Sequence, residues 1–247
     1  MYGKLYVVGF GPGSKGDMTF RAAKAIEDVD VVTGYTTYVN ILRELFPDKV
    51  YKATGMMKEK DRCRMAIEDA MNGRSVAMVS SGDSGIYGMA GIIYQLVEEM
   101  GADIEVEVIP GITAASAASA ILGAPLMHDL SMISLSDLMT PIETIMKRVD
   151  CAGQSDMVIC LYNPKSKGRL HNLSKAADVL LRYRSPDTPV GIVRNAGRAD
   201  QNKTITTLGS LKDADVDMLC TVIIGNSQTY VAGGRMITPR GYPIGGE

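Results

Sequence analysis

The sequence predicts an α/β protein built from two α/β domains, the first around a mainly parallel sheet and the second around a mixed sheet. Through the first half, short apolar segments alternate with longer amphipathic ones, which is typical of a parallel sheet covered by helices on both faces. In the second half, apolar segments follow one another across short connections. The length of 247 residues suits one large or two medium domains.

The first half contains five strand–helix pairs. Thr19 is placed to cap the first helix, and Gly73 is placed to end the third. Connections between the parallel strands should be right-handed. We expect strands over 4–10, 30–35, 49–54, 75–81 and 104–111, and helices over 20–29, 37–46, 58–73, 86–101 and 113–122.

The second half begins at a predicted boundary at Gly123–Pro125, which gives domains 1–123 and 124–247. Pro141 is typical of a first helical turn, with Thr140 as the cap. Two antiparallel pairings are expected among the last three strands, before a tail rich in glycine and proline. We expect strands over 131–137, 156–164, 188–197, 203–211 and 218–226, and helices after Pro141 and over 170–184.

The composition excludes several classes of function. With a net charge of −2 and no long run of one charge, the chain lacks the basic face that binds nucleic acid. No apolar stretch reaches the roughly 18 residues of a membrane helix, and we see no signal peptide. The 4 cysteines form no CxxC pair and the 2 histidines lack metal-ligand spacing. We therefore expect no metal site and a cytoplasmic, reducing location.

Glycine-rich loops follow the first, fourth and fifth strands, whose carboxyl ends should meet at the ligand-binding edge of the sheet. The first loop, GFGPG, is not a dinucleotide fingerprint, because Ser14 replaces the third glycine and Pro12 removes a backbone donor. No GK[ST] follows, which excludes a P-loop. We interpret the loop as a thin wall beside a flat ligand, with a plain tight turn as the alternative.

The other two loops each leave two interpretations open. Asp83, in SSGDSGIYG, can accept a hydrogen bond from a ribose hydroxyl or can cap a helix. Thr113 and Ala114, in PGITA, open a helix of very small residues, against which a ligand or simply another helix can pack. The meeting of all three loops at one edge is more informative than any one of them.

These loops belong to a larger set of motifs: GFGPG, SSGDSGIYGM, PGITAASAAS, GAPLMHD, ISLSDLMTP, LYNPKSKGR, TPVGIVRNAGR, TITTL and TPRGY. With this set, which spans Gly9 to Tyr242, the chain resembles the tetrapyrrole (corrin and porphyrin) methyltransferases. Within that family it is most similar to the C17-methyltransferases of cobalamin biosynthesis, which act on cobalt-factor III or precorrin-3B and contract the ring. One position departs from the pattern: the usual GDPG reads Gly82-Asp83-Ser84-Gly85, which puts the stiffness of this loop in doubt.

The resemblance implies two α/β domains with a cleft between them, a homodimer, and S-adenosylmethionine bound in the cleft as methyl donor. Cobalt would enter only as part of the substrate, and S-adenosylhomocysteine would leave as product. The residues that the resemblance assigns to the cofactor are Pro12, Gly82, Asp83, Ser84, Thr113, Ala114, Tyr162, Asn163, Gly191, Thr207 and Leu208.

Ring contraction requires a proton to move, and the acid–base candidates are His128, Asp129 and Asp137. His128 can also approach a substrate cobalt, or it can be a structural, hydrogen-bonded histidine. Substrates of this pathway carry many carboxylates, so loop cations are expected to bind some of them, with solvated surface charge as the alternative. The substrate-binding candidates are Gly11, Ser136, Lys165, Arg169, Arg194 and Arg198, with Lys167 and Arg240 as further cations.

Two other hypotheses stay open. A sister enzyme of the same fold, such as a precorrin-4 C11-methyltransferase or diphthine synthase, would carry the same cofactor loops. A nucleotide-binding or scaffolding protein without catalysis would carry the fold alone. Within the C17 branch we favour the cobalt-containing, anaerobic substrate, although no motif senses oxygen, and the scattered cysteines predict no C-terminal iron–sulfur centre.

Overall fold

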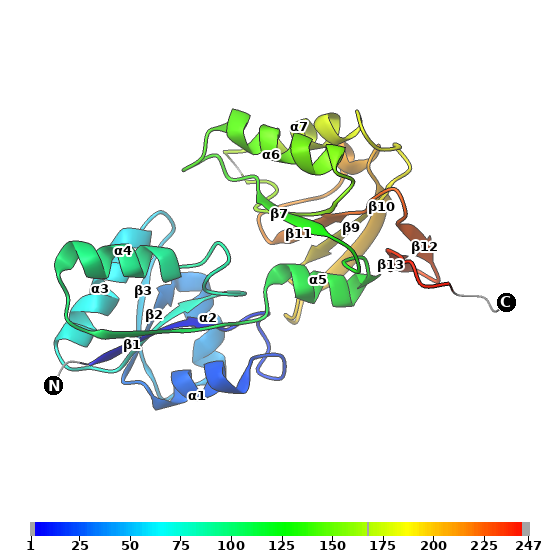
Figure 1. Ribbon diagram of the computed structural model, residues 1–247. Helices are drawn as coiled ribbons and strands as arrows, with labels where there is room; N and C mark the ends of the chain where they lie inside the picture. The colour runs from blue at the N-terminus through cyan, green and yellow to red at the C-terminus, as the bar shows by residue number, and fades with distance from the viewer. Residues whose placement is uncertain (1–2, 167, 244–247) are drawn as a thin grey trace. The chain divides into compact units, whose positions relative to one another are not determined.

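The computed structural model describes residues 3–166 and 168–243 and divides into two compact units between Ala114 and Ala115 (Figure 1). The predicted boundary at Gly123–Pro125 would leave helix α5 (Ala114–Leu122) with the first unit. In the structure, the buried side chains of α5 pack in one core with strands of the second unit, through Ala115, Ala118, Leu122, Cys160, Val193 and Ile223.

The N-terminal unit contains a five-stranded sheet in the order β3-β2-β4-β1-β5. Every neighbouring pair of strands is parallel, which confirms the predicted parallel sheet. The strands are β1 (Lys4–Gly9), β2 (Val31–Tyr35), β3 (Val50–Thr54), β4 (Val76–Ser80) and β5 (Glu105–Ile109).

Helices cover both faces of this sheet. Side chains alternate along β1, so that Val8 packs in the core beneath α1 and α2, while Val7 packs beneath α3 and α4. Thr19 accepts a hydrogen bond from the backbone N–H of Ala22 at 3.1 Å and is the cap of α1, as predicted. The helices are α1 (Phe20–Asp28), α2 (Thr36–Leu45), α3 (Glu59–Met71) and α4 (Ala90–Met100), the last of which begins later than residue 86 because the preceding glycine-rich segment is a loop.

The order of the strands places a switch point between β1 and β4. These two strands are neighbours, but the chain leaves β1 for α1 on one face and leaves β4 for α4 on the other. In open α/β sheets, a crevice for ligands forms outside the carboxyl ends of such a pair. The loops GFGPG and SSGDSGIYG begin at those two ends.

The C-terminal unit contains a mixed five-stranded sheet in the order β10-β9-β11-β8-β7. β7 and β8 are parallel, and the other neighbouring pairs are antiparallel, including the pair of β8 with β11 in addition to the two that were predicted. The strands are β7 (Leu130–Ser134), β8 (Val158–Tyr162), β9 (Pro189–Arg194), β10 (Asn202–Thr207) and β11 (Cys220–Ile224).

α6 (Ile142–Gln154) and α7 (Asn172–Leu180) lie together over one face of this sheet with the 3₁₀ turn η1 (Leu211–Asp213), and α5 packs on the other face (Figure 1). Pro141 itself is the N-cap of α6, so the prediction of Thr140 as cap was wrong. A small third sheet joins β6 (Gly123–Ala124), β12 (Tyr230–Ala232) and β13 (Arg235–Ile237), strands too short for their periodicity to be seen in the sequence. No helix among the described residues is long and apolar enough to cross a membrane.

Candidate functional site

The loops after β1, β4 and β5 are in direct backbone contact. Gly11 donates its N–H to the carbonyl of Gly82 at 2.9 Å. A Cβ atom on Gly9 would lie 2.8 Å from the nitrogen of Gly111, and a Cβ on Gly11 would overlap the backbone of Gly82. The glycines are therefore required by the close approach of the three loops, which the parallel sheet brings together as predicted.

Asp83 ties two of these loops together. One carboxylate oxygen accepts from the N–H groups of Gly85 at 2.8 Å and Ile86 at 3.1 Å, and the other accepts from the N–H of Gly111 at 3.0 Å. Because α4 begins only at Ala90, Asp83 is not the cap of that helix. Its carboxylate closes a turn within its own loop and fixes the loop after β5 against it.

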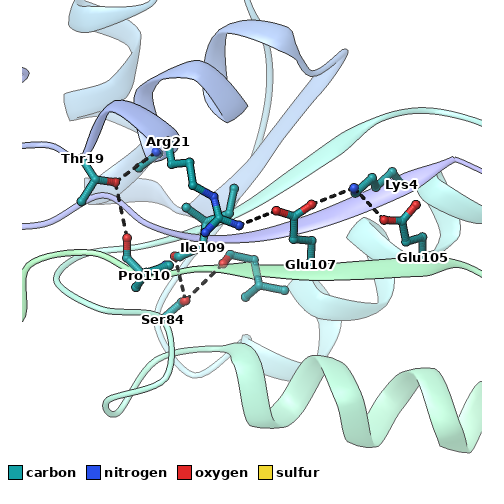
Figure 2. Close-up of polar contacts among 10 residues, drawn as sticks. Lys4, Thr19, Arg21, Ser84, Glu105, Glu107, Ile109 and Pro110 are labelled. Atoms are coloured by element: carbon teal, nitrogen blue, oxygen red, sulfur yellow. Dashed lines mark hydrogen bonds and ion pairs between the residues drawn. The ribbon is translucent and has the colours of Figure 1, made fainter.

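Ser84 holds the same loop from inside the unit. Its side chain is fully buried, and its hydroxyl lies 3.1 Å from the carbonyl oxygen of Val7 and 3.4 Å from that of Ile109 (Figure 2). The single hydroxyl proton is shared between a central strand and its neighbour. The loop that lacks the usual proline is thus anchored by a buried hydrogen bond, and the Ser84 side chain points into the sheet.

Ion pairs link β5, the outer strand of this sheet, to β1 and α1. Glu107 on β5 forms ion pairs with Lys4 at 2.7 Å and with Arg21 at 2.6 Å, and Lys4 also pairs with Glu105 (Figure 2). Hydrogen bonds from Lys4 and Arg21 lower the pKa of the Glu107 carboxyl. These charges keep an exposed strand edge from pairing with another chain.

In the C-terminal unit, Tyr162 is the last residue of β8 and Asn163 follows it. The hydroxyl of Tyr162 accepts from the N–H of Ala115 at 2.9 Å, at the first turn of α5. The amide of Asn163 donates to the hydroxyl of Ser134 at 3.0 Å, at the end of the parallel neighbour β7. We did not predict a role for Ser134; the signal was its place beside Ser136 in ISLSDL.

Three further cofactor candidates lie elsewhere in this unit. A Cβ on Gly191 would lie 2.7 Å from a methyl carbon of Leu122, so Gly191 lets α5 pack on the sheet. β10 runs antiparallel to β9, which places Thr207 beside Pro189 at the start of β9 and at the opposite edge from Tyr162. Leu208 is fully buried in the core beneath α6 and α7.

The three acid–base candidates are not brought together. His128 and Asp129 precede β7, whereas Asp137 follows it, and a five-residue strand is about 17 Å long. His128 is exposed, and its Nδ1 accepts from the N–H of Asp129 at 3.0 Å. Asp137 instead lies 3.9 Å from Nε of Arg169.

The candidate cations differ in how far they are already paired. Arg194 forms ion pairs with Asp215 at 3.0 Å and Asp217 at 3.4 Å, and hydrogen bonds to Cys220 and Asp215 raise the pKa of its guanidinium. Arg240 donates to a carbonyl next to His128, at the amino end of β7. Lys165 and Arg198 lie in the turns after β8 and β9, and Lys167 lies outside the described residues.

Comparisons with known proteins identify the family. The family model of tetrapyrrole (corrin/porphyrin) methylases matches residues 4–212. The chain belongs to the tetrapyrrole methylases. It is 50% identical to a probable cobalt-factor III C(17)-methyltransferase of Salmonella typhimurium over 97% of this chain and 100% of that protein. It is 38% identical to a precorrin-3B C(17)-methyltransferase of a Sinorhizobium species over 94% of this chain and 92% of that protein. The solved structure of the methyltransferase CobJ is 33% identical, with a TM-score of 0.88 over 96% of this chain and 100% of that one.

As a tetrapyrrole methylase, the chain is an S-adenosylmethionine-dependent methyltransferase, and the loops of the N-terminal unit suit that cofactor. Segments 9–14, 80–89 and 110–114 contain no Lys, Arg or His, and Asp83 is their one charged residue. Such loops offer backbone carbonyls to a sulfonium cation, and they lack the Lys and Arg side chains that commonly bind a phosphate. Among the described residues, no group of three or more His, Cys, Asp or Glu side chains is placed to hold a metal ion.

Proposed function

We propose that this tetrapyrrole methylase is the C17-methyltransferase that acts on cobalt-factor III in cobalamin biosynthesis, with ring contraction to the factor IV level. The observation that carries the proposal is the match, over essentially the whole of both chains, to a relative of that name. Identity to the precorrin-3B relative is lower, which favours the cobalt-containing substrate over the metal-free one. A C11-methyltransferase or diphthine synthase is the alternative.

Bound S-adenosylmethionine supplies an electrophilic methyl group on a positively charged sulfur. We propose that Pro12, Gly82, Thr113 and Ala114 border it through their backbone and small side chains, while Asp83 and Ser84 hold the loops in place. Transfer of a methyl group to a ring carbon depends mainly on alignment, so rigid loops are the chief contribution of the protein.

The proton transfer of ring contraction requires a separate group. Because His128 and Asp137 lie at opposite ends of β7, one proton-transfer site uses one of them and not both. We propose His128, since its imidazole is exposed, whereas Asp137 already lies beside the guanidinium of Arg169. His128→Ala should then reduce ring contraction while the affinity for S-adenosylhomocysteine stays unchanged.

The test is an anaerobic incubation of the protein with cobalt-factor III and isotopically labelled S-adenosylmethionine, read by product mass and visible spectrum. The expected result is one labelled methyl group and the spectrum of a contracted ring. Reactions with S-adenosylhomocysteine in place of the donor are the control. Methylation of a precorrin-4-level substrate or of a protein, with cobalt-factor III untouched, would support the alternative instead. Calorimetry that finds no binding of either S-adenosyl compound would overturn both.

We also propose that the enzyme works as a homodimer in the cytoplasm, on the basis of the family resemblance. Light scattering coupled to size-exclusion chromatography tests the assembly directly. A monomer mass at micromolar concentration would contradict the dimer.

A further inference from the structure

Arg169 has an unusual environment for a surface-loop arginine. Its side chain is only 9% exposed, and its Nε donates to the hydroxyl of Ser166 at 3.1 Å. Within the described residues, its Nη1 is buried and has no hydrogen-bond partner. A buried guanidinium N–H without an acceptor is costly, which points to a group that is supplied from outside the chain.

Backbone contacts link Arg169 to Ser166. The N–H of Arg169 donates to the carbonyl of Ser166 at 2.9 Å, and the N–H of Ser166 lies 3.4 Å from the carbonyl of Arg169. These backbone bonds and the bond from Nε fix the start and the middle of the side chain. The guanidinium is therefore held in place before any ligand arrives, which lowers the entropy cost of binding.

Asp137 is the acidic neighbour of this guanidinium, but the pair is loose. The distance of 3.9 Å between its carboxylate oxygen and Nε of Arg169 exceeds the 2.7–2.9 Å that is usual for a charge-assisted hydrogen bond. The Asp137 side chain is 33% exposed and so remains in contact with water. A second carboxylate can thus bind the guanidinium without breaking a tight ion pair.

The surroundings suit an anion. Arg169 lies beyond the carboxyl ends of the parallel strands β7 and β8, where the hydroxyl of Ser134 and the amide of Asn163 also lie. Lys165, in the same loop, adds a second positive charge among the described residues. A guanidinium presents parallel N–H groups that match a carboxylate in two-point contact.

We propose that Arg169 is an anchor for a carboxylate side chain of the tetrapyrrole substrate, which hydrogen bonds to Nη1, and that Asp137 is the internal counter-ion of this guanidinium. This inference rests on the proposed function for the identity of the ligand. It distinguishes Arg169 from Arg194, whose two carboxylate partners already neutralise it.

Binding constants of Arg169→Gln, Arg169→Lys and Asp137→Asn test the anchor, with Arg148→Gln on the exposed side of α6 as the matched control. For Arg169→Gln we expect cobalt-factor III to bind 10- to 100-fold more weakly and S-adenosylhomocysteine to bind within twofold of the wild type. Arg169→Lys should recover part of the loss, and Asp137→Asn should bind the substrate more tightly. Equal loss of affinity for both ligands would show a merely structural role and overturn the anchor.

A second measurement is independent of the methylation reaction. The thermal stability of the wild type and of Arg169→Gln is followed with increasing mellitate, a simple aromatic polycarboxylate. A rise in Tm for the wild type that is at least halved in Arg169→Gln supports the anchor, and equal rises contradict it. Failure of the proposed function would give a different result. Mellitate would then raise the Tm of the wild type more than that of Arg169→Gln, but the wild type would leave cobalt-factor III unmethylated.

Discussion

The carboxyl edges of the two sheets are built in opposite ways. In the N-terminal unit, the loops after β1, β4 and β5 contact one another through their backbones. The side chains of Asp83 and Ser84 form hydrogen bonds that hold these loops together. In the C-terminal unit, the edge at β7 and β8 presents side chains, and the buried Nη1 of Arg169 has no hydrogen-bond partner among the described residues. The first edge offers a preformed surface, whereas the second offers groups that still require a ligand.

The largest effect is expected where a side chain would separate the N-terminal loops. In Gly11→Ala, the added Cβ would overlap the backbone of Gly82, so one of the two loops must move. We expect affinity for S-adenosylhomocysteine to fall by more than 100-fold and Tm to drop by several degrees. Gly55→Ala is the control, because a Cβ there meets nothing within 4 Å. Calorimetry decides, and equal affinity in both variants would mean that the loop contact does not form the cofactor wall.

A smaller but more specific effect is expected from Asp83→Asn. The amide can still accept from Gly85 and Ile86, but its NH₂ would face the N–H of Gly111, so the link between the two loops is lost while the turn is kept. A hydrogen bond to a charged group contributes about 1.5–3 kcal/mol, and we therefore expect affinity for S-adenosylhomocysteine to fall at least tenfold. Asp48→Asn, at an exposed position, is the control.

Asp83→Asn also distinguishes a role of Asp83 in holding the loops from a direct contact of its carboxylate with the ribose. S-adenosylhomocysteine and an analogue without the ribose hydroxyls are compared in the wild type and in Asp83→Asn. If Asp83 acts only by fixing the loops, removal of the hydroxyls costs the same affinity in both proteins. A penalty that disappears in the variant would instead show that the carboxylate accepts from the ribose.

The contrast also explains what could be predicted from the sequence. In the N-terminal unit all strands are parallel, so their carboxyl ends share an edge, and loops rich in glycine at those ends could be placed together in advance. In the C-terminal unit, periodicity does not show the direction of a strand. Thr207 ends β10 and Leu208 follows it. Because β10 runs antiparallel to β9, both lie at the opposite edge from Tyr162.

Other features depend on contacts that no local pattern encodes. The small residues of α5 fit either unit, and only their packing against strands of the second unit, as with Leu122 over Gly191, assigns the helix to it. The separation of His128 from Asp137 follows from the length of β7 between them. The acidic partner of Arg169 lies 32 positions earlier in the chain and could not be identified from the sequence.

A modest effect is expected from Ser84→Ala, which removes the buried hydrogen bond but keeps Asp83 in place. One neutral hydrogen bond contributes about 1 kcal/mol to stability, so we expect Tm to fall by a few degrees. The affinity for S-adenosylhomocysteine should fall less than in Asp83→Asn. Thr36→Ala removes a hydroxyl that bonds to a carbonyl near the surface and is the control. A larger loss of affinity than in Asp83→Asn would make the hydroxyl, and not the carboxylate, the main support of the loop.

The smallest effect is expected on the rates at which cysteines react with iodoacetamide. These rates report how readily each unit opens. Burial raises the pKa of Cys63 in the N-terminal unit to about 11 and that of Cys160 in the C-terminal unit to about 12, while Cys151 is exposed. The thiolate is the reactive form, so at pH 8 both buried thiols are almost wholly protonated as well as shielded. Iodoacetamide at that pH should therefore modify Cys151 first, with Cys63 and Cys160 following only as each unit opens.

Saturation with S-adenosylhomocysteine should slow the modification of Cys63 most if the N-terminal loops provide the preformed part of the site, because a ligand stabilises the closed form that binds it. Mass spectrometry of each cysteine peptide over time gives the rates, and a ligand that slows Cys160 but not Cys63 would reverse the roles of the two edges.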